Sequence, residues 1–251
     1  MLFLTVRGLL YPLLGTLLGS AFVLFTRNKP TSRLLAVLDS IASGIMCAAA
    51  FFSLILPAIN QAEKDSLTAQ LSCSTGFFAG ILIFILLSKV SGKIFEQTDL
   101  SGNMLVWAVS LHNIPEGMAV GVVYAGLLAG NTDIGVAGAV TLSLGIALQN
   151  IPEGAIISLP MSARGKSRLT AFLYGSVSGI MELVAAIITL FFSSFVYGVL
   201  PFSLCFAAGA MFYVVLSELS GNFTSKKNGD ISLVFFGIGF IVMMLLDTLM
   251  V

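Results

Sequence analysis

The chain has 251 residues, of which 57% are apolar and 10% are charged, and its mean hydropathy is +1.03. Soluble domains carry about 25% charged residues, so this composition excludes an ordinary soluble domain. The formal net charge is zero, and the sequence has neither a basic block nor an aromatic reading surface. We therefore expect no nucleic-acid partner.

Eight apolar stretches are long enough to cross a bilayer, which takes about 20 residues in a helix. They cover residues 6–26, 34–59, 72–90, 103–128, 134–160, 169–194, 197–220 and 231–250. Only short connections remain between them. We therefore predict one all-α polytopic membrane domain over residues 1–251, with eight transmembrane helices.

Positive charge is distributed unevenly between the two sides of these spans. Ten of the twelve Lys and Arg residues lie in or beside the connections after spans one, three, five and seven: Arg27, Lys29, Arg33, Lys89, Lys93, Arg164, Lys166, Arg168, Lys226 and Lys227. Basic connections stay in the cytoplasm, so both termini are predicted to be extracytoplasmic. Arg7 precedes the first span as in a signal peptide. The absence of a cleavage motif favours a true span instead.

The first two spans contain small and sulfur-bearing residues. Gly15 and Gly19 have the small-xxx-small spacing that is typical of a helix contact. Met46, in the middle of the second span, is either a filler of the core or a metal ligand. The three cysteines lack CxxC or CxxH spacing, which indicates small buried hydrophobes: Cys47, Cys73 and Cys205.

Span four contains the motif HNIPEG at residues 112–117. His112 and Glu116 share a helix face because they are four residues apart, and Asn113 is turned by about 100°. Pro115 lacks an N–H, so we expect a kink in the helix at this point.

Span five repeats the motif as QNIPEG at residues 149–154. Gln149 and Glu153 again share a face, with Asn150 beside it. Spans four and five are consecutive and therefore antiparallel. Two copies of one motif on antiparallel helices predict an inverted repeat with a site near the middle of the membrane.

The two motifs together supply two carboxylates, one imidazole and three amide oxygens. An acid inside a bilayer costs about 2.5–3.5 kcal/mol, so such acids usually have a function. This ligand set suits zinc, iron, manganese or cadmium better than calcium or magnesium. Glu116 and Glu153 each lie between candidate ligands on two neighbouring faces of their helix. Each can therefore bridge two metal ions, as in a binuclear centre. The alternative is a pair of structural, hydrogen-bonded glutamates, and the repetition of the motif favours the metal site.

Three further acids lie in the later spans. Glu182 in span six is interpreted as a third carboxylate ligand, or as a hydrogen-bonding group between helices. Glu218, near the cytoplasmic end of span seven, is either a solvated charge or part of an exit path. Asp247, near the outer end of span eight, is expected at the membrane interface.

On the two motifs, the chain resembles the ZIP family of divalent-metal transporters, in particular its GufA-like prokaryotic branch. The resemblance implies an uptake carrier, usually a homodimer, with a binuclear centre. It implies a set of ligands: His112, Asn113, Glu116, Gln149, Asn150 and Glu153, with Glu182 and Met46 also matching. Ser53 falls where the family has an entrance residue.

Some positions depart from the family pattern. Many members carry histidine where this chain has Gln149, proline where it has Leu183, and an acid where it has Ala58. Both central motifs are intact, whereas the chain has fewer acids around them than many family members. We therefore expect an altered transport rate or metal selectivity rather than loss of transport.

Other functional classes can be compared on the same residues. The chain has a single histidine, which excludes the two or three histidines of a typical catalytic zinc site, so no enzyme is expected. A metal-gated channel or a non-transporting metal sensor remains an alternative to a carrier.

The metal is expected as the transported substrate, with no organic cofactor. Short connections and the absence of an organelle targeting signal indicate a bacterial inner membrane.

Overall fold

The structure is a computed structural model that describes residues 1–250 except 27–29, 64–66, 97–103, 131–134 and 224–228. Within the helices, some side chains also lie outside the described residues: those of 61–63, 67–69, 91–96, 104–112, 197–198, 218–223 and 250. The side chains of His112 and Glu218 are among them.

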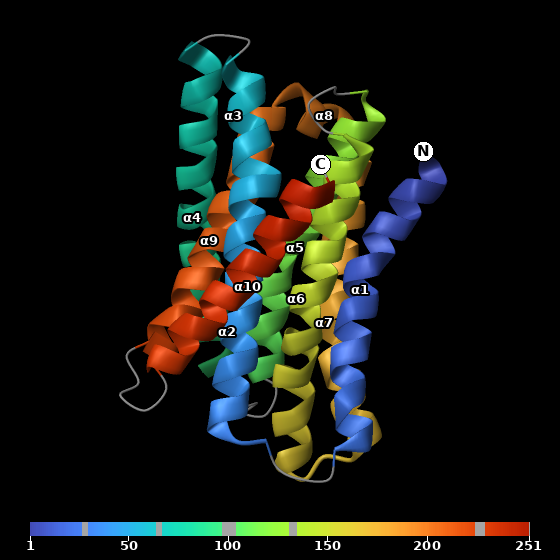
Figure 1. The fold of residues 1–251 in the computed structure, drawn as a ribbon, viewed down its shortest axis with the longest axis vertical. Coiled ribbons are helices and arrows are strands. Elements are labelled where there is room, and N and C mark those ends of the chain that lie inside the picture. Colours follow the sequence, from blue (N-terminus) through green and yellow to red (C-terminus); the bar gives the residue numbers. More distant parts are fainter. Residues whose placement is uncertain (27–29, 64–66, 97–103, 131–134, 224–228, 251) are drawn as a thin grey trace.

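All the regular secondary structure in the described residues is helical, which confirms the predicted all-α class. The elements are α1 (Leu2–Phe25), α2 (Ser32–Ala49), η1 (Ala50–Ile55), α3 (Leu56–Glu63), α4 (Leu67–Glu96), α5 (Met104–Leu128), α6 (Val136–Ala163), α7 (Arg168–Phe191), α8 (Ser193–Gly198), α9 (Leu200–Phe223) and α10 (Gly229–Met250). The long helices lie side by side, and both chain ends lie in the same half of the bundle (Figure 1).

Seven helices of the described part are long and apolar enough to cross a membrane: Leu2–Phe25, Ser32–Asn60, Gln70–Val90, Val136–Ala163, Arg168–Phe191, Leu200–Ser217 and Gly229–Leu249. The chain is therefore a multi-pass membrane protein. The predicted fourth span corresponds to α5, whose side chains are described only from Asn113 onwards. Eight crossings stay a prediction.

The predicted second span is one continuous helical rod whose middle part, η1, is a π-helix. In this segment the Leu56 N–H donates to the Phe51 carbonyl, five residues back. Pro57 follows at once, and a proline has no N–H and clashes with the carbonyl four residues before it. A wider turn relieves that clash, so we attribute the π-helix to Pro57.

Small residues allow α1 to lie close to α6, the helix with which α1 makes its most extensive contact. A Cβ atom at Gly15 would collide with the backbone of Ala147, and one at Gly19 with the backbone of Ile151. The helix contact predicted from the spacing of these two glycines is confirmed. It holds the first half of the second motif against the first helix.

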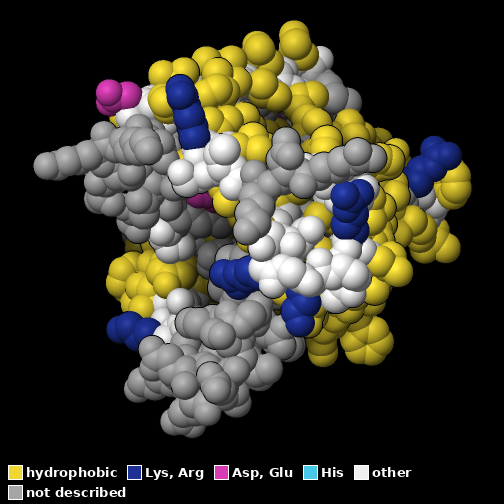
Figure 2. Space-filling model, turned by 90° about the horizontal axis from the view of Figure 1, so that it is seen from below, with side chains coloured by type: hydrophobic (Ala, Val, Ile, Leu, Met, Phe, Trp, Pro, Cys, Tyr) yellow, Lys and Arg dark blue, Asp and Glu magenta, His cyan; other side chains and the backbone are white. Residues whose placement is uncertain are grey.

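Lys and Arg side chains gather at the end of the bundle seen in Figure 2, which is the lower end of Figure 1. Five basic residues from the connections predicted to be cytoplasmic are described and exposed: Arg33, Lys89, Arg164, Lys166 and Arg168. The chain termini lie towards the opposite end (Figure 1). The asymmetry seen in the sequence is therefore also an asymmetry in space.

Candidate metal centre

The polar residues of both motifs whose side chains the structure describes are buried inside the bundle. Asn113, Glu116, Gln149 and Asn150 have no exposed surface, and Glu153 is 6% exposed. None of the five faces lipid. Because the bundle is surrounded by exposed aliphatic and aromatic side chains, these groups lie in an apolar environment.

Asn150 of α6 links three helices. Its side-chain amide donates to Glu182 Oε2 of α7 at 2.6 Å and to the Pro12 carbonyl of α1 at 3.2 Å. The carboxylate of Glu182 also lies near the Asn113 side chain and within electrostatic reach of the Glu153 carboxylate. Both copies of the motif therefore meet at Glu182, through Asn150 and Glu153 from the second copy and Asn113 from the first.

The two interpretations of Glu182 are compatible in this geometry. One carboxylate oxygen makes the helix–helix hydrogen bond to Asn150. For the other oxygen, Oε1, no partner is found in the described part of the chain, and the same holds for Asn150 Oδ1 and Gln149 Oε1. A buried polar atom without a partner costs about 1–3 kcal/mol. Three acceptor oxygens in this state are suited to a cation or to water.

In the described part of this region, the buried ionisable side chains are acidic. Among the described residues, those that are buried and ionised by type include Glu116, Glu153 and Glu182, but no Lys or Arg. Two carboxylates that face each other in an apolar bundle need a compensating positive charge. Protons or a metal cation supply that charge, because no cationic side chain of the described set is buried there.

Over the residues described, no group of three or more His, Cys, Asp or Glu side chains is close enough to hold a metal ion. The Glu153 carboxylate lies close enough to that of Glu182 for the two to repel each other. Met46 is buried within the apolar core, at 1% exposure.

Both motif prolines lie inside continuous helices. α5 continues through Pro115, and α6 continues through Pro152 and Pro160. Each proline leaves the carbonyl four residues earlier without its helical donor. The kinks expected from the sequence stay a prediction.

A second polar pair lies away from this cluster, and sequence reasoning did not join it. Ser53 Oγ of η1 donates to Asp247 Oδ1 of α10 at 2.9 Å. Ser53 is buried, and Asp247 is partly exposed. The pair lies towards the end of α10 that carries the C-terminus (Figure 1). Each residue stands out in the sequence as a polar group in an apolar span, but nothing in the sequence indicates that the two form a pair.

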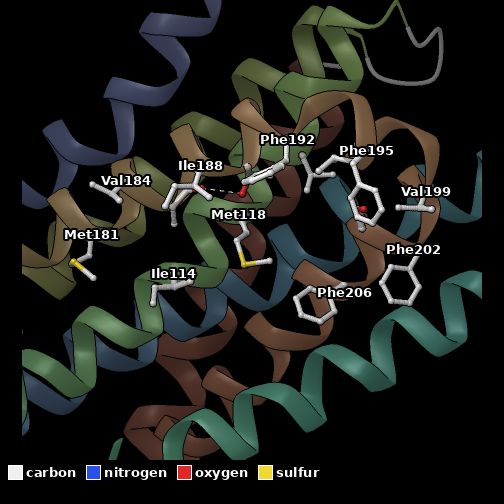
Figure 3. A pocket seen from close by; sticks show the side chains of 15 residues that line it. Ile114, Met118, Met181, Val184, Ile188, Phe192, Phe195, Val199, Phe202 and Phe206 are labelled. Atoms are coloured by element: carbon white, nitrogen blue, oxygen red, sulfur yellow. Dashed lines mark hydrogen bonds between the residues drawn. The ribbon is translucent and has the colours of Figure 1, made fainter.

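An apolar cavity of about 810 Å³ lies beside the acidic cluster, between α5, α7 and the start of α9. Figure 3 shows its labelled aliphatic, aromatic and methionine side chains around the hollow. Two of them, Ile114 and Met181, are next in sequence to Asn113 and Glu182. Among the described residues, no charged side chain lines it.

Membrane-length helices that enclose carboxylates and amides define a polytopic membrane protein with an intramembrane acidic site. A sequence model of the family described as "ZIP Zinc transporter" matches residues 95–247. The chain belongs to this family, as its resemblance on the two motifs predicted.

Several curated relatives agree with this assignment. The chain is 39% identical over 144 residues to "Zinc transporter ZIP11" of Homo sapiens, covering 57% of this chain and 42% of that protein. It is 32% identical over 221 residues to "Zinc transporter ZIPB" of Bordetella bronchiseptica, covering 82% and 69%. It is 35% identical over 180 residues to "Zinc transporter GufA" of Myxococcus xanthus, covering 67% and 68%. The chain thus spans less than half the length of the human relative.

Proposed function

We propose that this protein carries divalent transition-metal cations across a membrane into the cytoplasm, with zinc as the first candidate and iron, manganese or cadmium as alternatives. The observation that carries the proposal is the hydrogen bond from Asn150 to Glu182, with the Glu153 carboxylate close by, in a region where the described residues include no buried Lys or Arg. Three relatives with "zinc transporter" in their names support the same choice of cargo.

The proposed ligands come from four helices. They are His112, Asn113 and Glu116 of α5, Gln149, Asn150 and Glu153 of α6, Glu182 of α7 and Met46 of α2. A binuclear centre with Glu116 and Glu153 as bridging ligands is part of this proposal.

An inverted repeat of the fold is also part of it, and close backbone contacts support the repeat. In the α4–α9 pair, a Cβ at Gly80 would meet the Phe206 carbonyl, and a Cβ at Gly209 would meet the Phe77 carbonyl. Each contacted carbonyl therefore lies three residues before the glycine of its own helix.

The α2–α10 pair has the same arrangement. A Cβ at Gly44 would meet the Phe236 carbonyl, and one at Gly239 would meet the Ile41 carbonyl. The spacing of three residues between carbonyl and glycine recurs on both helices. α2 and α10 run in the opposite direction to α4 and α9 (Figure 1), as an inverted repeat requires.

The motif glycines extend the correspondence to the other helices. A Cβ at Gly117 would meet the backbone of Glu182 on α7, and a Cβ at Gly154 would meet the backbone of Thr16 on α1. Two halves related in this way can open alternately to the two sides of a membrane. The basic end in Figure 2 is proposed as the cytoplasmic side, which leaves both termini extracytoplasmic.

The proposal is tested by metal uptake into proteoliposomes, with Glu116→Ala and Glu153→Ala compared with the unchanged protein. Each substitution removes a proposed ligand, so uptake is expected to be lost while the amount of inserted protein stays the same. Undiminished uptake in both variants would end the carrier proposal. Saturable flux of low turnover supports a carrier, whereas single-channel currents would support a pore.

We also propose an assembly and a membrane for this protein. The resemblance to the ZIP family implies a homodimer, and short connections indicate a bacterial inner membrane. Chemical cross-linking in native membranes and cell fractionation test these two points. No step of the proposed transport needs catalysis.

A further inference from the structure

Two cysteines from distant parts of the chain come together in the structure. Cys73 of α4 and Cys205 of α9 are 7% and 3% exposed, and their thiol groups lie close enough to each other to interact. Cys73 Sγ also lies 3.6 Å from the Ala58 carbonyl of α3, to which it donates. Two sulfur atoms and one backbone oxygen from three helices therefore share one location.

The backbone explains why the two thiols meet. Gly209 of α9 lies close to the Phe77 carbonyl of α4. Cys205 is four residues before Gly209, and Cys73 is four residues before Phe77. Since residues four apart lie on the same helix face, the cysteines occupy that face one turn from the glycine contact. The close approach of the two helices continues to the cysteine pair.

Space for a ligand is present at the same place. Both cysteines line a cavity of about 630 Å³ between the ends of η1 and α3 and the helices α4 and α9. Gln70 and Ser74 of α4 line it too and add an amide and a hydroxyl group. A disulfide needs no cavity, whereas a bound ion needs room beside the sulfur atoms.

We propose that Cys73 and Cys205 form a binding site for a thiophilic divalent cation such as Cd²⁺ or Zn²⁺, with the Ala58 carbonyl as a third ligand. Thiolates prefer soft cations of this kind, and a coordinated thiol gives up its proton. The reaction is M²⁺ + 2 Cys–SH → M(S–Cys)₂ + 2 H⁺. The product has no net charge, which suits a buried place where an uncompensated charge is costly.

This site is separate from the proposed transport site. Its ligands come from α3, α4 and α9, and none of these helices contributes to the cluster around Glu182. Its sulfur donors also differ in kind from the oxygen donors of that cluster. The inference therefore does not rest on the proposed function.

The test is a titration of the full-length, reduced protein in detergent with Cd²⁺ in the absence of oxygen. The expected result is ultraviolet absorbance from thiolate-to-cadmium charge transfer, saturating at one ion per chain. Cys73→Ser and Cys205→Ser are each expected to lose this absorbance. Cys47→Ser is the matched control and keeps it, as does Glu153→Gln, which alters only the acidic cluster.

A second measurement needs no substitution and therefore does not depend on how a variant folds. Cd²⁺ is expected to protect Cys73 and Cys205 of the unchanged protein from alkylation, as seen by peptide mass mapping, and to leave Cys47 reactive. Absence of both protection and absorbance in fully reduced protein would overturn the site. So would a Cys73–Cys205 disulfide in protein isolated without reductant, if the reduced form then binds no Cd²⁺.

Discussion

Asn150 donates to the carboxylate of Glu182 across the α6–α7 contact at 2.6 Å, and it holds the Pro12 carbonyl of α1 with its second N–H. An amide in this position fixes the direction of one carboxylate oxygen and leaves the other oxygen available. The geometry therefore makes Asn150 a positioning residue for Glu182 as well as a proposed ligand.

Replacing Asn150 by alanine is expected to weaken metal binding by about 10–100-fold, because outer partners that orient a ligand have effects of this size. Isothermal titration of the purified protein with Zn²⁺ measures the change. Thr189→Val on α7 is a suitable control, since the Thr189 hydroxyl bonds only to the Ala185 carbonyl of its own helix in the contacts described. Equal affinities in both variants would contradict the role of Asn150.

Metal uptake is expected to fall as the external pH is lowered. A protonated carboxyl group is a poor ligand, and a cation that binds Glu153 and Glu182 has to displace their protons. The apparent KM for metal should therefore rise in acid, with a smaller effect on the maximal rate. Initial uptake rates across a pH series measure this, and an apparent KM that does not change with pH would argue against carboxylate ligands.

Gln149→His is expected to shift selectivity toward zinc. The Gln149 side chain is fully buried, and no partner is found for its amide oxygen within the described residues. Imidazole is a better zinc ligand than an amide oxygen. Competition between Zn²⁺ and Mn²⁺ for uptake measures the preference. If the preference stays the same, Gln149 does not touch the ion.

Asp247→Asn is expected to raise the KM for metal severalfold with little change in the maximal rate. Its carboxylate is partly exposed and oriented by Ser53, so it can attract a cation before the central site is reached. Ser53→Ala should have a smaller effect in the same direction. Thr248→Val is the control, because the Thr248 hydroxyl bonds within its own helix. An unchanged KM in Asp247→Asn would exclude this role.

Two glycines of α10 provide a test of the helix contacts. Gly239→Ala places a methyl group against the Ile41 backbone and is expected to lower stability by about 1–3 kcal/mol. Gly80→Ala, at the corresponding contact of α4, should cost a similar amount. Gly237→Ala has open space around it and should stabilise α10 by about 0.5–1 kcal/mol. Thermal unfolding in detergent compares the three, and equal Tm values for Gly237→Ala and Gly239→Ala would contradict the close contact.

The buried polar face of each motif helix was predictable from the sequence, because spacing along a helix determines which residues share a face. The burial of Glu182 inside the bundle was also predictable, because exposing an isolated acid of an apolar span to lipid is costly. The Pro12 carbonyl as an acceptor for Asn150 was not predictable. A backbone carbonyl carries no signature in the sequence, and its position depends on how α1 packs against α6.

Contacts between distant helices were missed for the same reason. Ser53 and Asp247 are 194 positions apart, and only the packing of η1 against α10 joins them. Cys73 and Cys205 were interpreted one at a time as buried hydrophobes, and both are buried. Their mutual contact required the α4–α9 crossing. The π-helix was missed because Pro57 signals a disturbed helix without specifying its form.

The scarcity of buried cations in the described bundle affects the energetics of a transport cycle. When the metal has left, the carboxylates around Glu182 can lose their repulsion only by taking up protons. A carrier of this kind would then move metal in one direction and protons in the other, with little net charge crossing the bilayer. The gradient of acidity, more than the electrical potential, would set how far the cargo can be concentrated.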